Sequence, residues 1–298
     1  LFADEQLRRL IDTALVRNID LQVAQLRITE AAAALKAARL VYLPSFDFAP
    51  TGGASSFDGA KASWTYSVPV TASWEVDIFG RLTNAKRRSR AALLQSEAYR
   101  DAVRTQLIAD VADYYYRLLS LDAQVAVTEQ AVERYCEQVR VMRALKAAGN
   151  TNEAAVAQTE ATLYAAETTL HDLNRSIRQT ENSLALLLGD TPHAIARTTL
   201  EAQSVPAELS VGIPLQLLAR RPDIRQSEQA LVAYYATAEA RAALYPSLTL
   251  SGSAGWTNNA GAVVADPGKL LLSAAGSLLQ PIFRAGQNRA RVKIAKAQ

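Results

Sequence analysis

Few residues of this chain have the types and spacing that catalysis requires. The sequence holds two histidines, His171 and His193, and one cysteine, Cys136. A single cysteine excludes an internal disulfide framework and a thiolate metal cluster, and two distant histidines leave little material for acid–base or metal chemistry. The sequence also lacks a glycine-rich phosphate loop and a serine elbow. We therefore predict that the chain is not an enzyme and binds no cofactor or metal.

Two charged or polar clusters remain as candidate sites. Asp113 precedes three tyrosines at 114–116, and helical spacing favours packing between helices for these rings. The basic cluster at 86–90 contains Arg87 and Arg88, and because no aromatic residues interleave with it, we predict no nucleic-acid binding. Cations at a helix start oppose the helix dipole, so helix stability does not explain them. We hypothesise a contact with lipid phosphates, and a solvated charged face explains the cluster equally well.

The composition places the chain among folded proteins. It has 298 residues, of which 49% are hydrophobic and 20% charged, with a net charge of +3. These values exclude a disordered chain and a polytopic helical membrane protein. No stretch offers the roughly 18 uncharged apolar residues that a membrane-spanning helix needs. Any membrane contact therefore depends on another kind of element.

Long breaker-free runs predict unusually long helices. Residues 1–43 and 81–148 contain neither Gly nor Pro. As one helix, the second run would measure about 100 Å at 1.5 Å per residue, which is much longer than a compact domain. A further run, 151–188, ends at Gly189 with Pro192 just beyond it, which is the expected helix stop.

Both of the longer runs carry a seven-residue repeat. In the first, the apolar seam consists of Val111, Leu118, Val125, Val132 and Val139, followed three places on by Tyr114, Leu121, Thr128, Tyr135 and Met142. In the second it consists of Val156, Leu163, Leu170, Ile177 and Leu184, followed by Thr159, Ala166, Leu173, Thr180 and Leu187. Such heptads predict an antiparallel coiled-coil hairpin with its tip near 146–152. An ordinary amphipathic bundle is the alternative.

Two other segments alternate with a period of two. Apolar residues occupy every second position from Trp64 to Val76, and the positions between them are mostly polar. The segment 247–256, which ends at Trp256, alternates likewise. Long strands with this pattern suit an outer-membrane sheet that is apolar towards lipid and polar towards a lumen. Pro69 is a difficulty, because proline normally lies at a sheet edge or bulge. A small soluble sandwich is the alternative.

These units occur twice in the chain. The nine residues 38–46 match residues 240–248, and Ile78-Phe79 matches Ile282-Phe283. The organisation is therefore helix, hairpin and long helix, written twice, with the second copy cut off where its long helix begins.

Four segments carry a resemblance to a known family. The run Leu-Leu-Ala-Arg-Arg-Pro-Asp-Ile-Arg at 217–225 and the run Ala-Arg-Ala-Ala-Leu-Tyr-Pro-Ser-Leu at 240–248 resemble the signature of the TolC-type outer membrane factors. The similarity is strongest to the lipoprotein branch of multidrug efflux channels. Asp-Ile-Phe-Gly-Arg at 77–81 and Leu-Leu-Leu-Gly-Asp-Thr-Pro at 186–192 are similar to two further pieces of that pattern.

The resemblance implies a fold that is mainly α with membrane β-hairpins. Long antiparallel coiled-coil helices and two β-hairpins per chain would contribute to a trimeric 12-stranded β-barrel joined to an α-helical barrel. We accordingly divide the chain into a periplasmic helix of repeat 1 (1–43), an outer-membrane hairpin (44–80), a long helical hairpin (81–189), an equatorial connecting segment (190–221), a periplasmic helix of repeat 2 (222–245), a second outer-membrane hairpin (246–283) and the start of a second long helix (284–298).

The resemblance also implies a function, partners and a location. We expect a passive exit duct of a tripartite drug efflux system in the cell outer membrane, with helices in the periplasm. The partners would be two further copies of the chain, a periplasmic adaptor, an inner membrane transporter and outer membrane lipid. The alternatives are a type I protein-secretion duct and a coiled-coil scaffold without a pore.

Particular residues of the chain match the expected contacts. The turn at Ala148, Gly149, Asn150 and Thr151 resembles the tip that meets the adaptor, with Gly149 supplying a conformation that residues with a Cβ resist; a solvated loop without a partner is the alternative. The lipid-interface candidates are Trp64, Trp74, Trp256, Arg87 and Arg88.

Two departures from the family lead us to expect a piece of a longer protein. Members of this branch usually begin with a lipidated cysteine, and none lies near Leu1. They also carry a second long helical hairpin, whereas this sequence stops at Gln298 inside a helix-forming run.

Overall fold

The structure is a computed structural model that describes residues 2–56, 63–203, 221–229, 231–259, 264–282 and 284–297, without the side chains of 231, 233 and 264–267. The chain forms two compact units. The first contains Leu1–Gln25 and Arg100–Leu218, and the second contains Leu26–Tyr99 and Ala219–Gln298. The residue-by-residue division at 1–43, 44–80 and onwards stays a prediction.

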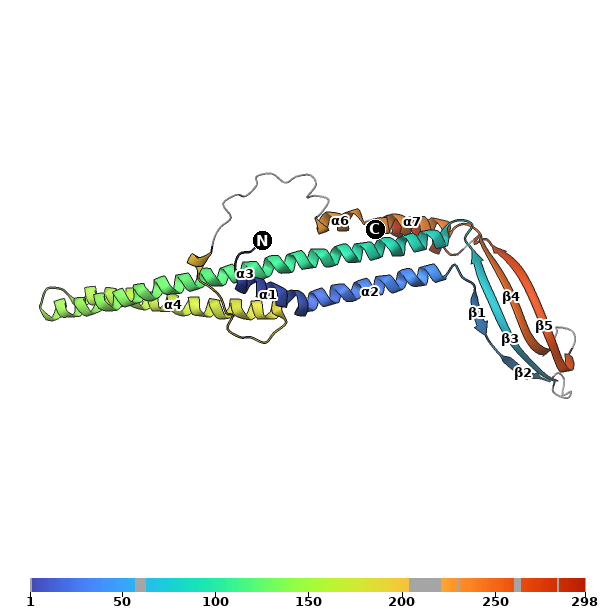
Figure 1. Cartoon of the computed structure of the whole chain (residues 1–298), viewed down its shortest axis with the longest axis horizontal. Helices are drawn as coiled ribbons and strands as arrows, with labels where there is room; N and C mark the ends of the chain where they lie inside the picture. The colour runs from blue at the N-terminus through green and yellow to red at the C-terminus, as the bar shows by residue number, and fades with distance from the viewer. Residues whose placement is uncertain are drawn as a thin grey trace. The chain divides into compact units, whose positions relative to one another are not determined.

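The first unit is built on a helical hairpin. Its arms are the later part of α3 (Arg81–Ala147) and the whole of α4 (Glu153–Leu188), which run antiparallel (Figure 1). The single helix predicted for 81–148 is therefore confirmed. Near the tip, the two arms are joined by an ion pair of 2.6 Å between Arg143 and Glu160 and by a second one between Lys146 and Glu153.

The seven-residue seam is where this hairpin buries its apolar side chains. Every predicted seam position on both arms is buried or half-buried. Leu118 is fully buried, whereas Val127, which lies outside the seam on the same arm, is 68% exposed. The period of 3.5 residues keeps one side of each helix against the other, so the hydrophobic effect acts along this seam.

A short N-terminal helix completes the core of the first unit. Helix α1 (Glu5–Arg17) packs Leu7 and Ile11 against Val111 and Tyr115 of α3 and against Leu184 of α4. Full burial of each such side chain stabilises the fold by about 1.5–3 kcal/mol. A one-turn 3₁₀ helix at Leu200–Ala202 follows in the connecting segment.

The expected single helix at 1–43 is interrupted at Asn18. The chain leaves α1 in an extended conformation there and resumes as α2 (Ile19–Leu40). The buried Asn18 side chain accepts a hydrogen bond from the Leu21 amide and donates one to the Leu187 carbonyl, each at 3.0 Å. Asparagine side chains compete in this way with the helical ladder, so a run without Gly or Pro can still break.

The second unit contains an antiparallel sheet with strands in the order β1-β3-β4-β5 (Figure 1). The strands are β1 (Ser45–Phe48), β2 (Thr51–Ser55), β3 (Ser63–Val76), β4 (Ser247–Asn259) and β5 (Val264–Leu279). Strand β2 also pairs with β3, so β1 and β2 form one interrupted strand on the same side of β3. The two alternating segments are thus the paired strands β3 and β4, and the predicted class of long helices plus two hairpins is confirmed.

The interruption between β1 and β2 accommodates Pro69. Strand β1 ends where Phe48 meets Val70, and β2 begins where Thr51 meets Ser67, so no β1 or β2 residue pairs with Pro69. On its other side Pro69 lies opposite Gly255. A Cβ at Gly255 would lie 2.5 Å from the Pro69 Cα atom, so this position of β4 requires glycine. A proline can therefore lie within an inner strand.

In addition to parts of α2 and α3, the second unit contains three further described helices. The segment predicted as one helix at 222–245 contains α6 (Pro222–Glu228) and α7 (Leu231–Ala242), and α8 (Gln287–Ala297) follows the sheet. The Thr237 hydroxyl of α7 donates to the Ala295 carbonyl of α8 at 2.8 Å. Part of the predicted connecting segment, 204–220, and Phe283 lie outside the described residues. Among the described helices, none combines the length and hydropathy that a membrane crossing requires.

Candidate functional site

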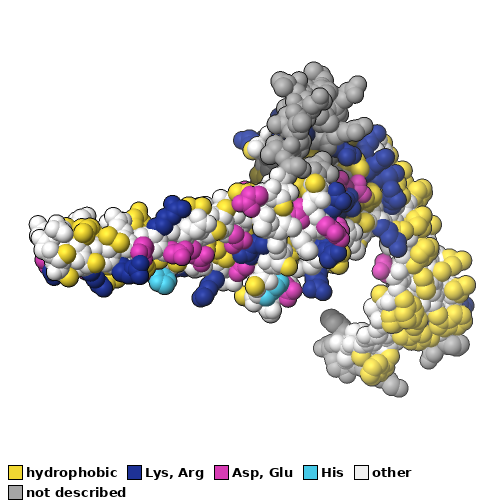
Figure 2. All heavy atoms as spheres, turned by 60° about the vertical axis from the view of Figure 1, so that its left-hand side comes forward, with side chains coloured by type: hydrophobic (Ala, Val, Ile, Leu, Met, Phe, Trp, Pro, Cys, Tyr) yellow, Lys and Arg dark blue, Asp and Glu magenta, His cyan; other side chains and the backbone are white. Residues whose placement is uncertain are grey.

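The sheet separates apolar from polar side chains across strands β1, β3, β4 and β5. In register, Phe48, Val70, Ala254 and Leu272 lie side by side on one face. Twelve large apolar side chains of this face are exposed: Phe46, Phe48, Trp64, Tyr66, Val68, Val70, Trp74, Leu250, Trp256, Leu270, Leu272 and Leu278. Figure 2 shows hydrophobic side chains gathered over the sheet. An exposed apolar patch of this extent indicates contact with lipid or with another protein.

The opposite face of the sheet is mainly hydroxylated. Thr71, Ser253 and Ser273 lie in register there, and the two serine hydroxyls are 2.7 Å apart. Leu271 and Leu279 interrupt the polar pattern. A water-soluble sheet would show its polar face to the solvent and bury its apolar face. An apolar face that is exposed, as here, is typical of strands that lie between lipid and a water-filled interior.

The spacing of the tryptophans matches the height of a membrane. Trp64 and Trp74 lie ten positions apart on the apolar face of β3. Ten residues span about 33 Å along a strand, and a tilt of about 40° reduces this to about 25 Å, the height of an outer-membrane apolar band. Trp256 lies between these levels, opposite Val68. The Trp74 indole donates to the Tyr42 carbonyl at 2.9 Å, so this ring has a fixed orientation.

Short-range contacts join β3 to the start of α3. The Asp77 carboxylate accepts hydrogen bonds from the amides of Leu82 and Thr83 at 3.0 and 2.7 Å. Burial raises the pKa of Asp77, but these bonds and one from the Thr83 hydroxyl outweigh it, so the pKa lies below its usual value. Arg81 binds both carboxylate oxygens of Glu75, at 2.9 and 2.5 Å, and this bidentate pairing raises the pKa of Arg81.

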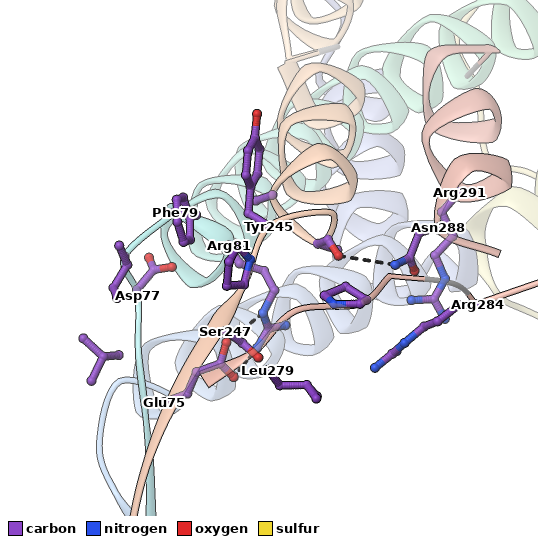
Figure 3. A pocket seen from close by; sticks show the side chains of 16 residues that line it. Glu75, Asp77, Phe79, Arg81, Tyr245, Ser247, Leu279, Arg284, Asn288 and Arg291 are labelled. Atoms are coloured by element: carbon purple, nitrogen blue, oxygen red, sulfur yellow. Dashed lines mark hydrogen bonds and ion pairs between the residues drawn. The ribbon is translucent and has the colours of Figure 1, made fainter. Parts of the chain in front are cut away.

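A pocket of about 250 Å³ lies in the second unit where the strands meet α3 and α8 (Figure 3). Its strand wall includes Glu75, Ser247 and Leu279, and its helix wall includes Arg81 and Arg291. Beside it, the Phe79 and Tyr245 rings stack with their centroids 5.1 Å apart. The segments 77–81 and 240–248, quoted above for the family resemblance, therefore meet at this pocket.

The basic cluster at 86–90 does not act as one surface. Arg87 is exposed. Arg88 forms an ion pair with Glu239 of α7 at 2.9 Å, and the Lys86 ammonium lies 5.4 Å from the centre of the Tyr42 ring. The charge of Arg88 is thus partly compensated within the unit, which leaves Arg87 as the better candidate for an external phosphate.

The tip of the helical hairpin has a defined backbone conformation. Gly149 has a φ of 78°, and the amides of Gly149 and Asn150 donate to the carbonyls of Lys146 and Leu145, each at 2.9 Å. This pair of bonds closes the end of α3. The Asn152 side chain accepts from the Ala155 amide at 2.9 Å and opens α4. Ala148, Gly149 and Asn150 are exposed, and Thr151 is half-buried, so the predicted contact residues lie together.

Two polar clusters of the first unit were not predicted from the sequence. The Asp4 carboxylate accepts hydrogen bonds from the Tyr115 and Thr198 hydroxyls and the Gln203 amide at 2.7, 2.6 and 2.8 Å. Burial acts to raise the pKa of Asp4, but these hydrogen bonds lower it by more. The pKa of Asp4 therefore lies well below its usual value. Arg197 pairs with Asp122 of α3 and with Glu181 of α4, which raises the pKa of Arg197.

These clusters join residues that are far apart in the sequence, so spacing alone could not reveal them. One signal was available for Tyr115, because a tyrosine on the buried side of a long helix usually finds a partner for its hydroxyl.

Comparisons with known proteins agree with this geometry. The cation efflux system protein CusC of Escherichia coli and the solvent efflux pump outer membrane protein SrpC of Pseudomonas putida are each 30% identical to the chain. The alignments cover 99% and 100% of the chain and 65% of each relative, so the chain spans about two thirds of the length of these curated relatives.

The fold and the sequence family can also be matched directly. The open state of the Neisseria gonorrhoeae MtrE outer membrane channel superposes with a TM-score of 0.84 at 30% identity, over 99% of this chain and 68% of that one. The family described as outer membrane efflux protein matches residues 10–190 and 213–298. On these grounds, and on the two-faced sheet that continues into a long helix, the chain belongs to the outer membrane efflux protein family.

Proposed function

We propose that this chain is a subunit of an outer membrane exit duct, through which a tripartite efflux system passes small molecules from the periplasm to the exterior. The observation that carries the proposal is the sheet itself, whose apolar face is exposed on β1, β3, β4 and β5 and whose opposite face is mainly polar. Lipid satisfies the first face and a water-filled lumen satisfies the second. The chain is not catalytic in this role, and the path is passive.

Assembly with two further copies follows from the edges of the sheet. Among the described strands, β5 and the pair β1 and β2 each have a neighbour on one side only. Unpaired backbone amides and carbonyls are not tolerated in lipid, so these edges need partners. Pairing of β5 with the first strand of the next copy, repeated around a three-fold axis, gives a closed barrel with twelve strands in the manner of the family.

In this proposal, the choice of the transported molecules depends on other proteins of the efflux system. The similar proteins are named for cations in one case and for solvents in another, although both are 30% identical to this chain over nearly its whole length. An energised inner membrane transporter therefore selects and drives the cargo, and the duct conducts it. Nothing in this role calls for nucleic acid.

The hairpin tip is the proposed contact with a periplasmic adaptor. Ala148, Gly149 and Asn150 are exposed, and no atom lies within 4 Å of a Cβ built at Gly149. A Gly149→Val substitution therefore alters the shape and conformation of the tip without disturbing the packed seam. We expect cells that carry it to lose efflux-dependent resistance while trimers still form, and Ala161→Val on the exposed side of α4 to have no effect. Full resistance in cells that carry Gly149→Val would contradict the proposal that the hairpin tip contacts the adaptor.

The lipid contacts lie on the apolar face of the sheet and beside it. Trp64 and Trp74 mark the two ends of the band, Trp256 lies between them, and Arg87 is the candidate for a lipid phosphate. The compensated Arg88 contributes less.

Reconstitution of the full-length protein into a planar bilayer tests the duct. We expect discrete conductance steps and a trimer in detergent. A coiled-coil scaffold would give neither, and a monomer that stays soluble without detergent would refute the proposal. A neighbouring gene for a proton-driven transporter or for an ATP-driven exporter would separate drug efflux from protein secretion.

A further inference from the structure

The pocket at the base of the sheet is lined by residues of the polar face, together with Val76 of the other face. Ser247 pairs with Leu279, and Glu75 pairs with Thr249, and all four belong to the face opposite the exposed apolar residues. Glu75, Ser247 and Leu279 line the pocket (Figure 3). A molecule in the pocket therefore contacts the polar face of the sheet, which faces the lumen in the proposed duct.

The acidic groups around the pocket already have partners. Both carboxylate oxygens of Glu75 are bound by Arg81. The Asp77 carboxylate accepts the amides and the hydroxyl at the start of α3. Glu239, which lies nearby in a neighbouring hollow that Arg291 also lines, is paired with Arg88 at 2.9 Å. None of these carboxylates is free to neutralise a further cation.

Two arginines of the pocket have no such partner. Arg284 and Arg291 are exposed, and among the described residues neither forms an ion pair. Helix α8, which carries Arg291, contains no acidic residue at all. The first turn of α8 also lies at the pocket through Asn288, and helix N-termini attract negative charge. The pocket is therefore a polar hollow with uncompensated positive charge on both its turn and its helix.

The turn that carries Arg284 differs from its counterpart in the first repeat. Gly80 directly precedes α3, whereas Arg284, Ala285 and Gly286 precede α8. Ala285 has a φ of 45°, a left-handed conformation that costs a residue with a Cβ about 1–2 kcal/mol. The second repeat therefore has two additional residues before the glycine, Arg284 and Ala285. Arg284 adds a positive charge to the pocket, and no residue of the first repeat corresponds to it.

We propose that this pocket binds the anionic group of a solute that passes through the duct, with Arg284 and Arg291 as the residues that hold it. A carboxylate fits best, because arginine binds its two oxygens in a planar, bidentate geometry. The proposal rests on the proposed duct. In an assembly of three copies, the pocket occurs three times around the path, and the resulting ring of cations favours anions over cations in transit.

Ion selectivity of the full-length protein in planar bilayers tests the site. Under a KCl gradient, we expect the wild-type reversal potential to show a preference for chloride. The Arg284→Gln, Arg291→Gln double variant is expected to lower the chloride-to-potassium permeability ratio by about twofold or more. Lys293→Gln, on the same helix and exposed but outside the pocket lining, is the matched control and is expected to leave the ratio unchanged.

Citrate serves as the carboxylate probe in a second measurement. We expect citrate to reduce the wild-type chloride current and to have a weaker effect on an Arg284→Lys, Arg291→Lys variant, which keeps the charge but loses the bidentate geometry. This variant also provides the test if the glutamine variant fails to assemble. Absence of any conductance would refute the duct itself. A conducting protein whose selectivity and citrate block are unchanged in these variants would refute the anion site alone.

Discussion

At the scale of single residues, half-buried polar groups of the first unit hold its segments together. Asp4 is the clearest case, since one carboxylate accepts hydrogen bonds from α3, from Thr198 and from Gln203 while it also caps α1 through the Gln6 amide. Hydrogen bonds to a charged group contribute about 1.5–3 kcal/mol each when buried, and less where solvent reaches them. The clamp therefore attaches the N-terminal segment and the connecting segment to the helical core.

An Asp4→Asn substitution tests this clamp. The folded pKa of Asp4 lies below its usual value of 3.8, so its contribution to stability is present above that pH and is lost as the pH falls below it. We expect the variant to lose about 2 kcal/mol of unfolding free energy at pH 7 and the gap from wild type to narrow between pH 5 and pH 2. Urea unfolding followed by helical circular dichroism measures this. Asp12→Asn, on the exposed side of α1, is the control. A stability difference between Asp4→Asn and wild type that does not change with pH would contradict the role of the Asp4 carboxylate in this clamp.

Gly255 is decisive for a different reason, because its neighbour Pro69 leaves no room for a side chain. We expect Gly255→Ala to destabilise the sheet by about 3 kcal/mol or to prevent assembly, since the strands must separate to admit the methyl group. At Gly252, on the same strand, a Cβ would lie 3.4 Å from the nearest atom, the Ser273 carbonyl oxygen, so Gly252→Ala is the matched control. Heat-induced dissociation of the trimer in detergent compares the two. Equal dissociation temperatures would show that the β3–β4 pairing is looser than described.

At the scale of elements, sequence periodicity predicted most of what the structure contains. The seven-residue seam predicted α3 and α4, because packing acts on the same side of a helix along its length. The two-residue alternation predicted β3 and β4. The break at Asn18 was missed, because it depends on the carbonyl of Leu187. The pocket was missed for a similar reason, since its walls come from 75–81, 242–247 and 279–291, which only the folded sheet brings together.

Helix ends offer a test at this scale, because α3 and α4 both close on a glycine in the left-handed region. Gly149 and Gly189 have φ values of 78° and 66°, so alanine costs each about 1 kcal/mol in conformation. A Cβ at Gly189 would also lie 2.7 Å from the Arg17 carbonyl oxygen, whereas nothing lies within 4 Å at Gly149. We expect Gly189→Ala to lower the thermal midpoint clearly more than Gly149→Ala. Similar midpoints would mean that α1 moves aside freely.

At the scale of the whole molecule, aromatic and charged residues are distributed by environment. The chain has three tryptophans, and all of them lie on the apolar face of the sheet. The helical hairpin carries none. The formal net charge of +3 is divided unevenly, because the first unit contains 13 Lys and Arg against 19 Asp and Glu, whereas the second unit, which holds the sheet, contains 19 against 10. Membrane contact in the proposed duct therefore depends on the sheet surface.

This distribution makes tryptophan fluorescence a reporter for the sheet alone. We expect the emission of the protein in liposomes to be strongly quenched when the lipids carry bromine on their acyl chains, because Trp64, Trp74 and Trp256 face those chains. Iodide added to the water is expected to have little effect. Trp256→Phe, at the level of Val68, is expected to remove more of the bromine quenching than Trp74→Phe at the end of the band. Emission that responds only to iodide would place the sheet in water.

The half-paired edges of the sheet also affect the genetics of the proposed assembly. Each subunit has two unpaired strand edges, and in the proposed assembly only other copies of the chain can pair with them. A mutation that disrupts one edge therefore affects every trimer that contains the variant subunit, even when the other two subunits are wild type. A cell with one normal and one damaged allele would lose more pores than its proportion of defective copies, and such alleles would behave as dominant.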